Sequence, residues 1–382
     1  MDFGGLSDLF SMIYGYILPF LFVLTIVVFF HELGHFLVAR WCGVAVDSFS
    51  VGFGREMFGY TDRLGTRWKL CWIPLGGYVK FHGDENAASM RAEAPDGATE
   101  LTEADRKGNF HEKPLASRAA IVAAGPIANF ILAIIIFAVM FTTVGRPTLS
   151  PIVDEVAAGS AAAEAGFVAG DVVVSIDETA INSFTDLQRI VSRSADRTLS
   201  VVVERDGGQV MLSATPRLQE ITSAFGNKMR VGVLGIRRTA SPDAVKIVKT
   251  DPVTSIGLGA SETWNVVTTT LSYLGRVITG SESADQLGGP IRIAQISGQA
   301  ATMGLLTLIN LTAVLSVSIG LINLFPIPML DGGHLVYYGI EALRGKPLSA
   351  ASQDIGFRIG MGLVLMLMLF ATWNDLVHLQ VL

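Results

Sequence analysis

Two histidines and a glutamate stand close together near the end of the first apolar segment, as His31-Glu32-Leu-Gly-His35. On a helix, side chains four positions apart lie on one face, so both imidazoles can bind the same Zn²⁺ ion. Glu32 projects about 100° round from His31, where its carboxylate can hold and deprotonate a water activated by the metal. This pattern predicts a zinc hydrolase with His31 and His35 as ligands and Glu32 as the general base.

The apolar surroundings of this motif favour the metal interpretation over a structural pair of histidines. Ionisable residues inside a bilayer cost about 2.5–3.5 kcal/mol each on insertion scales, and they are functional by default. A catalytic zinc usually has three protein ligands and one open position. Asp331 is a candidate for the third ligand, because it follows two prolines in the string Asn323-Leu-Phe-Pro-Ile-Pro-Met-Leu-Asp331. Position alone fits an aspartate that caps a new helix equally well.

The composition points to a membrane protein. Half of the 382 residues are hydrophobic and only 16% are charged, a balance that favours several bilayer spans over a soluble domain. The net charge of −6 provides no basic surface, so nucleic acid is not an expected partner. Two cysteines, Cys42 and Cys71, cannot form a disulfide framework and are predicted to be apolar packing residues.

Four stretches lack charge for long enough to cross a bilayer. They run from Leu9 to Phe30, between Arg118 and Arg146, from Met303 to Phe325, and from Ile359 to Trp373. Lys and Arg gather in the first and third connections, so the positive-inside rule places these two in the cytoplasm. Both termini and the long 145–300 region then lie outside, and the first stretch is expected to be a retained span rather than a signal peptide.

These motifs resemble the site-2 protease family of intramembrane zinc metalloproteases, and within it the proteobacterial branch known as regulator of sigma-E protease. The resemblance covers essentially the whole chain. It is carried by the His31 motif, by the Asn323–Gly332 string with its two prolines, by Gly125-Pro126-Ile-Ala-Asn129, and by Pro74-Leu-Gly-Gly-Tyr-Val-Lys80.

Several roles follow from the resemblance rather than from spacing. It implies that Asp331 is the third zinc ligand, and that Asn323 contacts substrate or the developing oxyanion. The alternative for Asn323 is an interhelical hydrogen bond. It also implies a membrane-inserted β element around residues 65–81, with Gly76 and Gly77 at an edge that receives an unwinding substrate. From the sequence alone, a surface hairpin with an aromatic belt fits these residues equally well. His334 is expected to pack or to support the site from outside the ligand set.

Residues 145–217 read as a PDZ-like domain. Two strand-like runs, Val153–Val156 and Val172–Ile176, flank a Gly159–Gly166 segment that fits the turn, helix and turn of bacterial protease PDZ domains. Such a domain binds an extended peptide by adding a strand to a sheet edge, although a folded spacer without ligand stays an alternative. Proteobacterial relatives of this type usually carry two PDZ domains, and only one clear copy is recognisable here.

The predicted fold class is therefore a multi-span α-helical membrane protein with four transmembrane helices, a membrane-associated β element and an inserted PDZ-like α/β domain. Its segments are transmembrane helix 1 (1–41), a cytoplasmic connection with the β element (42–117), helix 2 (118–144), the PDZ-like domain (145–217), a periplasmic connection with an amphipathic helix (218–300), helix 3 (301–334), a cytoplasmic loop (335–358) and helix 4 (359–378).

The expected function is regulated intramembrane proteolysis in a stress response, with Zn²⁺ as the cofactor. The substrates implied are single-span membrane proteins such as an anti-sigma factor, or remnant signal peptides, cut within the lipid bilayer. The expected location is the bacterial inner membrane, with a periplasmic PDZ-like domain and an active site near the cytoplasmic side. One alternative is a zincin-type membrane protease for misfolded proteins with a glutamate as third ligand. Another is a non-catalytic scaffold that binds through its PDZ domain.

Overall fold

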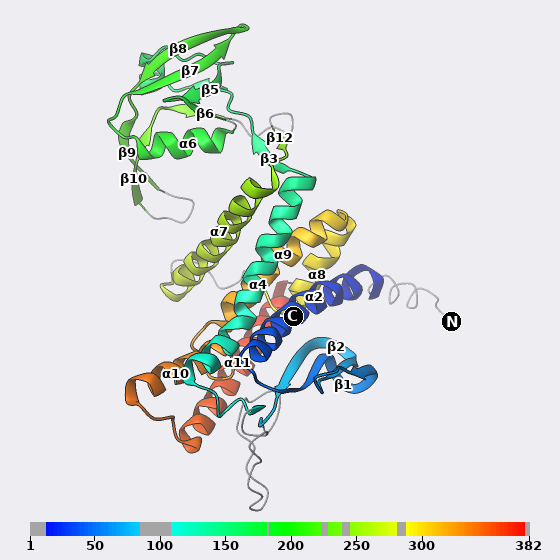
Figure 1. The fold of residues 1–382 in the computed structure, drawn as a ribbon. Coiled ribbons are helices and arrows are strands. Elements are labelled where there is room, and N and C mark those ends of the chain that lie inside the picture. The colour runs from blue at the N-terminus through cyan, green and yellow to red at the C-terminus, as the bar shows by residue number, and fades with distance from the viewer. Residues whose placement is uncertain are drawn as a thin grey trace, which may run out of the picture. The chain divides into compact units, whose positions relative to one another are not determined.

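A computed structural model of the chain describes residues 13–84, 108–181, 183–222, 228–238, 245–280 and 288–378. The chain divides into two compact units (Figure 1). The helical unit comprises Met1–Ala138 and Ile256–Leu382, and the second unit comprises Val139–Ser255.

Four helices within the described residues are long and apolar enough to cross a membrane. The first runs from Ile13 to Trp41 as a π-helical turn, η1 (Ile13–Ile17), followed by α2 (Leu18–Trp41). The others are α4 (Leu115–Thr143), α9 (Leu305–Asn323) and α11 (Ala350–His378). Together with the small sheets they confirm the predicted fold class of a multi-span helical membrane protein.

The third of these helices is shorter than the sequence prediction of 301–334. A separate helix, α8 (Pro290–Thr302), precedes α9, and Gly304 between them has a φ of 113° that favours glycine. Pro326 and Pro328 follow the end of α9 at Asn323 and cannot donate the hydrogen bonds that would continue it. A new helix, α10 (Asp331–Arg344), begins after them. The break therefore places Asp331 at a helix start rather than inside a span.

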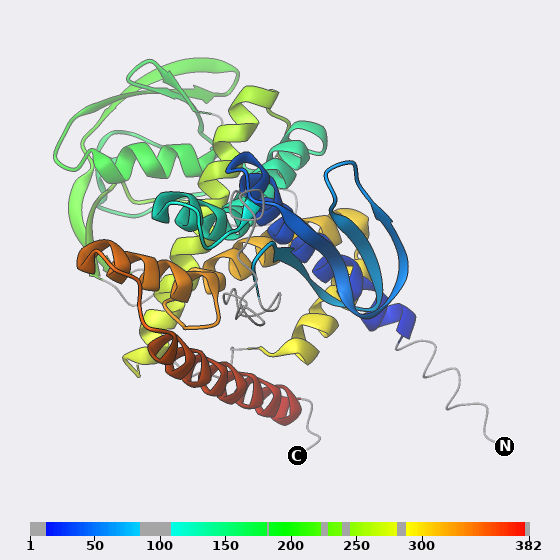
Figure 2. The ribbon, with the colours of Figure 1, turned by 60° about the horizontal axis from the view of Figure 1, so that its bottom comes forward.

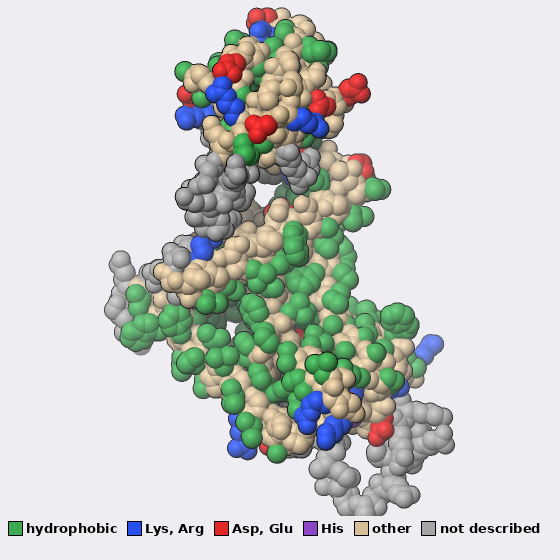
Figure 3. Space-filling view, turned by 90° about the vertical axis from the view of Figure 1, so that its left-hand side faces the viewer, with side chains coloured by type: hydrophobic (Ala, Val, Ile, Leu, Met, Phe, Trp, Pro, Cys, Tyr) green, Lys and Arg blue, Asp and Glu red, His purple; other side chains and the backbone are tan. Residues whose placement is uncertain are grey.

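The outer surface of the helical unit is apolar. Large hydrophobic side chains of α11, among them Leu365, Leu369 and Phe370, are exposed. Figure 3 shows one face on which hydrophobic side chains cover much of the surface over the long helices, with Lys and Arg gathered at its lower end. In water such a surface would be an aggregation hazard, whereas in a bilayer it contacts acyl chains.

A two-stranded antiparallel sheet, β1 (Val46–Thr61) and β2 (Arg67–Phe81), lies beside α2 in both ribbon views (Figures 1 and 2). Its inner face buries Phe49 and Phe81 in a cluster with Phe36 of α2. Its outer side exposes aromatic residues such as Phe58 and Trp72. The predicted β element is thus present, and its insertion into a membrane stays a prediction.

Another long helix is α7 (Pro252–Ile278), which lies within the 218–300 segment where the sequence predicted an amphipathic helix. Several of its large apolar side chains are exposed, including Val253, Trp264 and Ile278.

The second unit is a small α/β fold with its own core. Its largest sheet has the strand order β6-β5-β7-β8, and the core beneath it includes Val173, Leu199 and Val201. The elements are β3 (Arg146–Leu149), β4 (Glu155–Val156), α5 (Ala161–Glu164), β5 (Val172–Ile176), β6 (Thr179–Ala180), α6 (Phe184–Arg193), β7 (Leu199–Arg205), β8 (Gly208–Ala214), β9 (Arg217–Thr222), β10 (Lys228–Val233), β11 (Ile236–Arg237) and β12 (Val245–Val248).

This unit extends beyond residue 217, where the sequence prediction ended the domain. Strand β11 pairs with β4, and β12 pairs with β3 at the other end of the unit's sequence. Residues after 217 therefore complete the same compact unit instead of forming a linker.

Candidate metal centre

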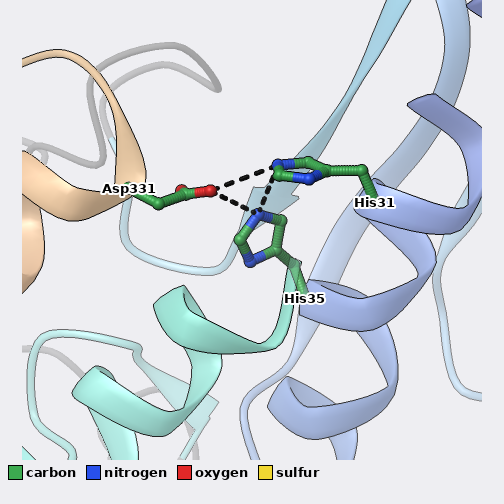
Figure 4. A group of neighbouring side chains, drawn as sticks. All are labelled: His31, His35 and Asp331. Carbon is green, nitrogen blue, oxygen red and sulfur yellow. Dashed lines mark hydrogen bonds and ion pairs between the residues drawn. The ribbon is translucent and has the colours of Figure 1, made fainter. Parts of the chain in front are cut away.

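Three side chains from two distant parts of the chain meet at one point. His31 and His35 project from α2 one turn apart, and Asp331 is the first residue of α10 (Figure 4). The two Nε2 atoms are 3.3 Å apart, and Asp331 Oδ2 lies 3.2 Å from Nε2 of His31 and 3.6 Å from Nε2 of His35. All three residues are buried. The structure thus brings the three predicted ligands together.

The spacing and chemistry of these atoms fit zinc. Ligand atoms about 2.0–2.1 Å from a tetrahedral Zn²⁺ are separated from each other by roughly 3.3 Å, close to the distances between these three atoms. Asp331 Oδ2 is buried and accepts no hydrogen bond from the described residues, although two imidazole nitrogens lie beside it. Such an orphaned carboxylate oxygen is costly unless a cation occupies the point on which the three atoms converge.

The position of Asp331 favours its ionised form. Burial opposes ionisation, but the neighbouring imidazoles of His35 and His31 outweigh it and hold the pKa of the Asp331 carboxyl below its ordinary value. The N-terminal end of α10 also favours a negative charge at this place. An anionic oxygen beside two imidazoles is a donor set that zinc accepts readily.

The packing of α4 against α2 leaves no room for extra atoms. Gly34 of the histidine motif packs so tightly that an added Cβ would lie 2.6 Å from Ala128 Cβ. At Gly125 an added Cβ would overlap with Nε2 of His35 and lie 2.9 Å from Cε1 of His31. Glycine at 125 therefore lets both imidazoles lie against the backbone of α4. The carbonyl of Ile121, one turn earlier, accepts a hydrogen bond from Nδ1 of His35 at 2.8 Å.

We expect Gly125→Ala to weaken zinc binding by about tenfold or more, since forcing atoms into a packed site typically costs about 1–3 kcal/mol. Zinc affinity of the purified protein, measured by competition with a chromogenic chelator, checks this. Gly339→Ala is the matched control, because Gly339 lies in α10 with nothing within 4 Å of an added Cβ. Equal affinity in both variants would show that the imidazoles do not depend on this contact.

Glu32 faces a cavity of about 200 Å³ beside the three ligands. Val79 of β2 lines the same cavity. Gly77, also in β2, packs closely here, because an added Cβ would lie 2.6 Å from the Ser50 carbonyl oxygen and 3.4 Å from Cγ of Glu32. The lining residues are His31, Glu32, His35, Phe53, Gly77, Tyr78, Val79, Phe81, Asn323, Met329, Leu330 and Asp331.

Of the other two residues predicted to bind substrate, Asn323 lies at the cavity and Gly76 does not. Asn323 lines the cavity, and its amide Nδ2 donates to the Ile319 carbonyl of its own helix at 3.0 Å, rather than across helices. Gly76 does not line the cavity. It has a φ of 103° and lies under the ring of Phe53, which leaves no space for a side chain there.

The remaining described histidines outside the motif have other surroundings. His82 pairs with Asp47 and His111 with Asp84, both away from the ligands. His334 lies three residues after Asp331, and its ring meets Tyr337 edge to face at 6.2 Å between centroids. Burial lowers the pKa of the His334 imidazole.

Two contributions to the site could not be assigned from the sequence. Gly125 and Asn129 belong to a recognisable motif, but only the structure shows that their spacing of four places both on one face of α4 towards the histidines. The Ile121 carbonyl had no signal at all, because any residue supplies a backbone oxygen.

A buried pair of histidines and an aspartate among long apolar helices defines a membrane-embedded zinc metalloprotease. Comparison with known proteins agrees. The family described as "Peptidase family M50" matches residues 19–367, and the chain belongs to this family of site-2 proteases.

Individual relatives cover nearly the whole chain. A protein of Agrobacterium fabrum named "Putative zinc metalloprotease Atu1380" is 51% identical, over 95% of this chain and 96% of its own length. "Metalloprotease MmpA" of Caulobacter vibrioides is 44% identical, over 93% of this chain and 94% of its own length.

Proposed function

We propose that this intramembrane zinc metalloprotease cleaves the transmembrane segments of single-span proteins, such as an anti-sigma factor or remnant signal peptides, in regulated intramembrane proteolysis. The observation that carries the proposal is the location of the metal ligands. His31 and His35 lie within an apolar helix of spanning length, and Asp331 follows the end of another. A peptide bond that reaches them must come from a segment at membrane depth.

The chemistry divides between the metal and the chain. His31, His35 and Asp331 would hold the zinc ion, which would supply a Lewis acid to activate water and polarise the scissile carbonyl. Glu32 accepts the proton of the attacking water and delivers it to the leaving amine nitrogen. Glu32 and Val79 of β2 both line the cavity beside the three ligand residues.

The sheet beside α2 offers a way to hold an unwound substrate. A helical segment hides its amides in i→i−4 hydrogen bonds, so it must open before cleavage. Gly77, Tyr78 and Val79 line the cavity beside the metal ligands, so this edge of β2 faces it. An extended segment paired along this edge would present its carbonyls to the site. Gly77 lines the cavity without a side chain and so leaves room for a second backbone, whereas Gly76 lies outside it under Phe53. Asn323 supplies an amide to the same cavity.

The second unit is proposed to act as a PDZ-like gate on the periplasmic side. Its edge strand β8 carries the exposed Met211, and such an edge can accept an added peptide strand. Three basic residues support a cytoplasmic location for the connection between α10 and α11: Arg344 at the end of α10, Lys346 in the connection and Arg358 early in α11. Both termini and the second unit then face the periplasm of a bacterial inner membrane.

The substrate class is testable with purified protein in liposomes. We expect a single-span substrate that has been shortened on the outside to be cleaved, and the same span with a bulky folded outer domain to be cleaved at least tenfold more slowly. Deleting 145–217 would remove too much structure, so the comparison varies the substrate alone. Equal cleavage of both substrates would contradict the gate. Cleavage of an unfolded soluble protein, with no cleavage of either span, would contradict the intramembrane substrate class.

Different observations disfavour the two alternative functions considered from the sequence. A zincin-type site would need a glutamate as third ligand, whereas the third residue beside the histidines is Asp331. A non-catalytic scaffold would have no use for this metal site, and the chain belongs to a family of metalloproteases.

A further inference from the structure

The two histidine ligands differ in what holds their second ring nitrogen. An imidazole binds zinc through a nitrogen without a proton, so when Nε2 is the ligand atom the proton must be on Nδ1. Nδ1 of His35 lies 2.8 Å from the backbone carbonyl oxygen of Ile121, which can only accept a hydrogen bond. Nδ1 of His31 meets instead the side-chain amide of Asn129, at 3.2 Å. The tautomer of His31 therefore depends on one side chain.

Only one orientation of that amide suits a zinc ligand. If Asn129 turns Nδ2 towards His31, the ring nitrogen must accept, and Nε2 then carries the proton that blocks the metal. If the amide is rotated by 180°, its oxygen accepts the Nδ1 proton and Nε2 is free to bind. Asn129 is fully buried, and with Nδ2 towards the ring its Oδ1 has no partner among the described residues. Rotation gives this oxygen the partner that it lacks.

The backbone of Asn129 is fixed independently of the metal. Ser316 of α9 donates a hydrogen bond from Oγ to the Asn129 carbonyl at 2.9 Å. Gly320, one turn further along α9, packs so that an added Cβ would lie 3.1 Å from Cβ of Asn129. Gly125, one turn earlier on α4, has the imidazoles against its backbone. The packing of α2, α4 and α9 therefore places the Asn129 amide next to His31.

We infer that Asn129 is a positioning residue of the zinc site. Its side-chain oxygen accepts a hydrogen bond from the Nδ1–H of His31. This hydrogen bond fixes the tautomer and the ring orientation that bind the metal. Partners of this kind typically change metal affinity by about 10–100-fold. The inference rests on the metal site and not on the proposed substrate. A different substrate would leave it intact.

The test compares two substitutions at one position by the zinc affinity of the purified protein, measured by chelator competition. Asn129→Leu removes the acceptor and keeps the approximate volume, so zinc affinity should fall about 10–100-fold. Asn129→Asp retains an oxygen that accepts from Nδ1, so its affinity should stay within a few fold of wild type. Asn310→Leu, at an exposed position of α9, is the matched control and should bind zinc as wild type does.

A purely structural role for Asn129 predicts a different pattern. Thermal unfolding of the zinc-free proteins would then show both substitutions destabilised, and Asp would bind zinc as weakly as Leu. That pattern would overturn the inference, as would wild-type zinc affinity in the Leu variant. If the Leu variant does not fold, Asn129→Ala and Asn129→Asp give the same comparison, because alanine also lacks the acceptor in a smaller side chain.

Discussion

Replacing Glu32 by glutamine is expected to leave zinc bound and to reduce cleavage by at least about 10²–10⁴-fold, the usual contribution of general acid–base catalysis. Glutamine has nearly the same shape as glutamate, but it cannot take a proton from water. Because Glu32 is not among the three converging ligand atoms, the metal site itself is unchanged.

The measurement pairs zinc content with the rate of substrate cleavage by wild type and Glu32→Gln in the same liposomes. Glu56→Gln is a suitable control, because Glu56 lies in β1 and pairs with Arg67 rather than facing the cavity. Loss of zinc from the Glu32 variant would make Glu32 a structural part of the metal site instead of the base. Cleavage at the wild-type rate would remove it from the mechanism.

Replacing Asp331 by asparagine is expected to weaken zinc binding by more than the roughly 10–100-fold that loss of an outer hydrogen-bond partner costs. Asparagine keeps an oxygen at this position but loses the negative charge that pairs with a dication. The two imidazoles would then hold the metal with a neutral third donor. Cleavage should fall with zinc occupancy, and high zinc concentration should restore part of it.

Zinc content after dialysis against a weak chelator checks this. Asp354→Asn supplies a control, since Asp354 lies near the start of α11 and is not a ligand. An Asp331 variant that retains full zinc content would exclude Asp331 from the ligand set. The site would then need a donor from outside these three residues.

The histidine half of the site follows from local sequence. Four positions on a helix always bring His31 and His35 to one face, whatever the rest of the fold does. Asp331 is different, because about three hundred residues separate it from them. Its proximity depends on how α10 begins after the two prolines, and no local pattern distinguishes a ligand there from a capping residue. Family resemblance, rather than spacing, made it the predicted ligand.

The limits of the elements show the same division between local and distant causes. Apolar runs predicted four spans because bilayer thickness sets their length. The apolar stretch from Met303 to Phe325 nearly matches the third span, Leu305–Asn323. The extension of the second unit to Ser255 was not predicted. It depends on pairing of β11 with β4 and of β12 with β3, and strands this short have no recognisable sequence pattern. The sequence places Asn129 in a motif but does not show its partner, because the His31 atom that it faces belongs to another helix.

The central claim is that the metal centre cuts peptide bonds inside the membrane. Mass spectrometry of products from a single-span substrate, incubated in liposomes with wild type or Glu32→Gln, tests it most directly. The account predicts a cut within the apolar span for wild type, no such product for the variant, and equal zinc in both proteins. A cut in the soluble part of the substrate, or the same product from the Glu32→Gln protein, would contradict it.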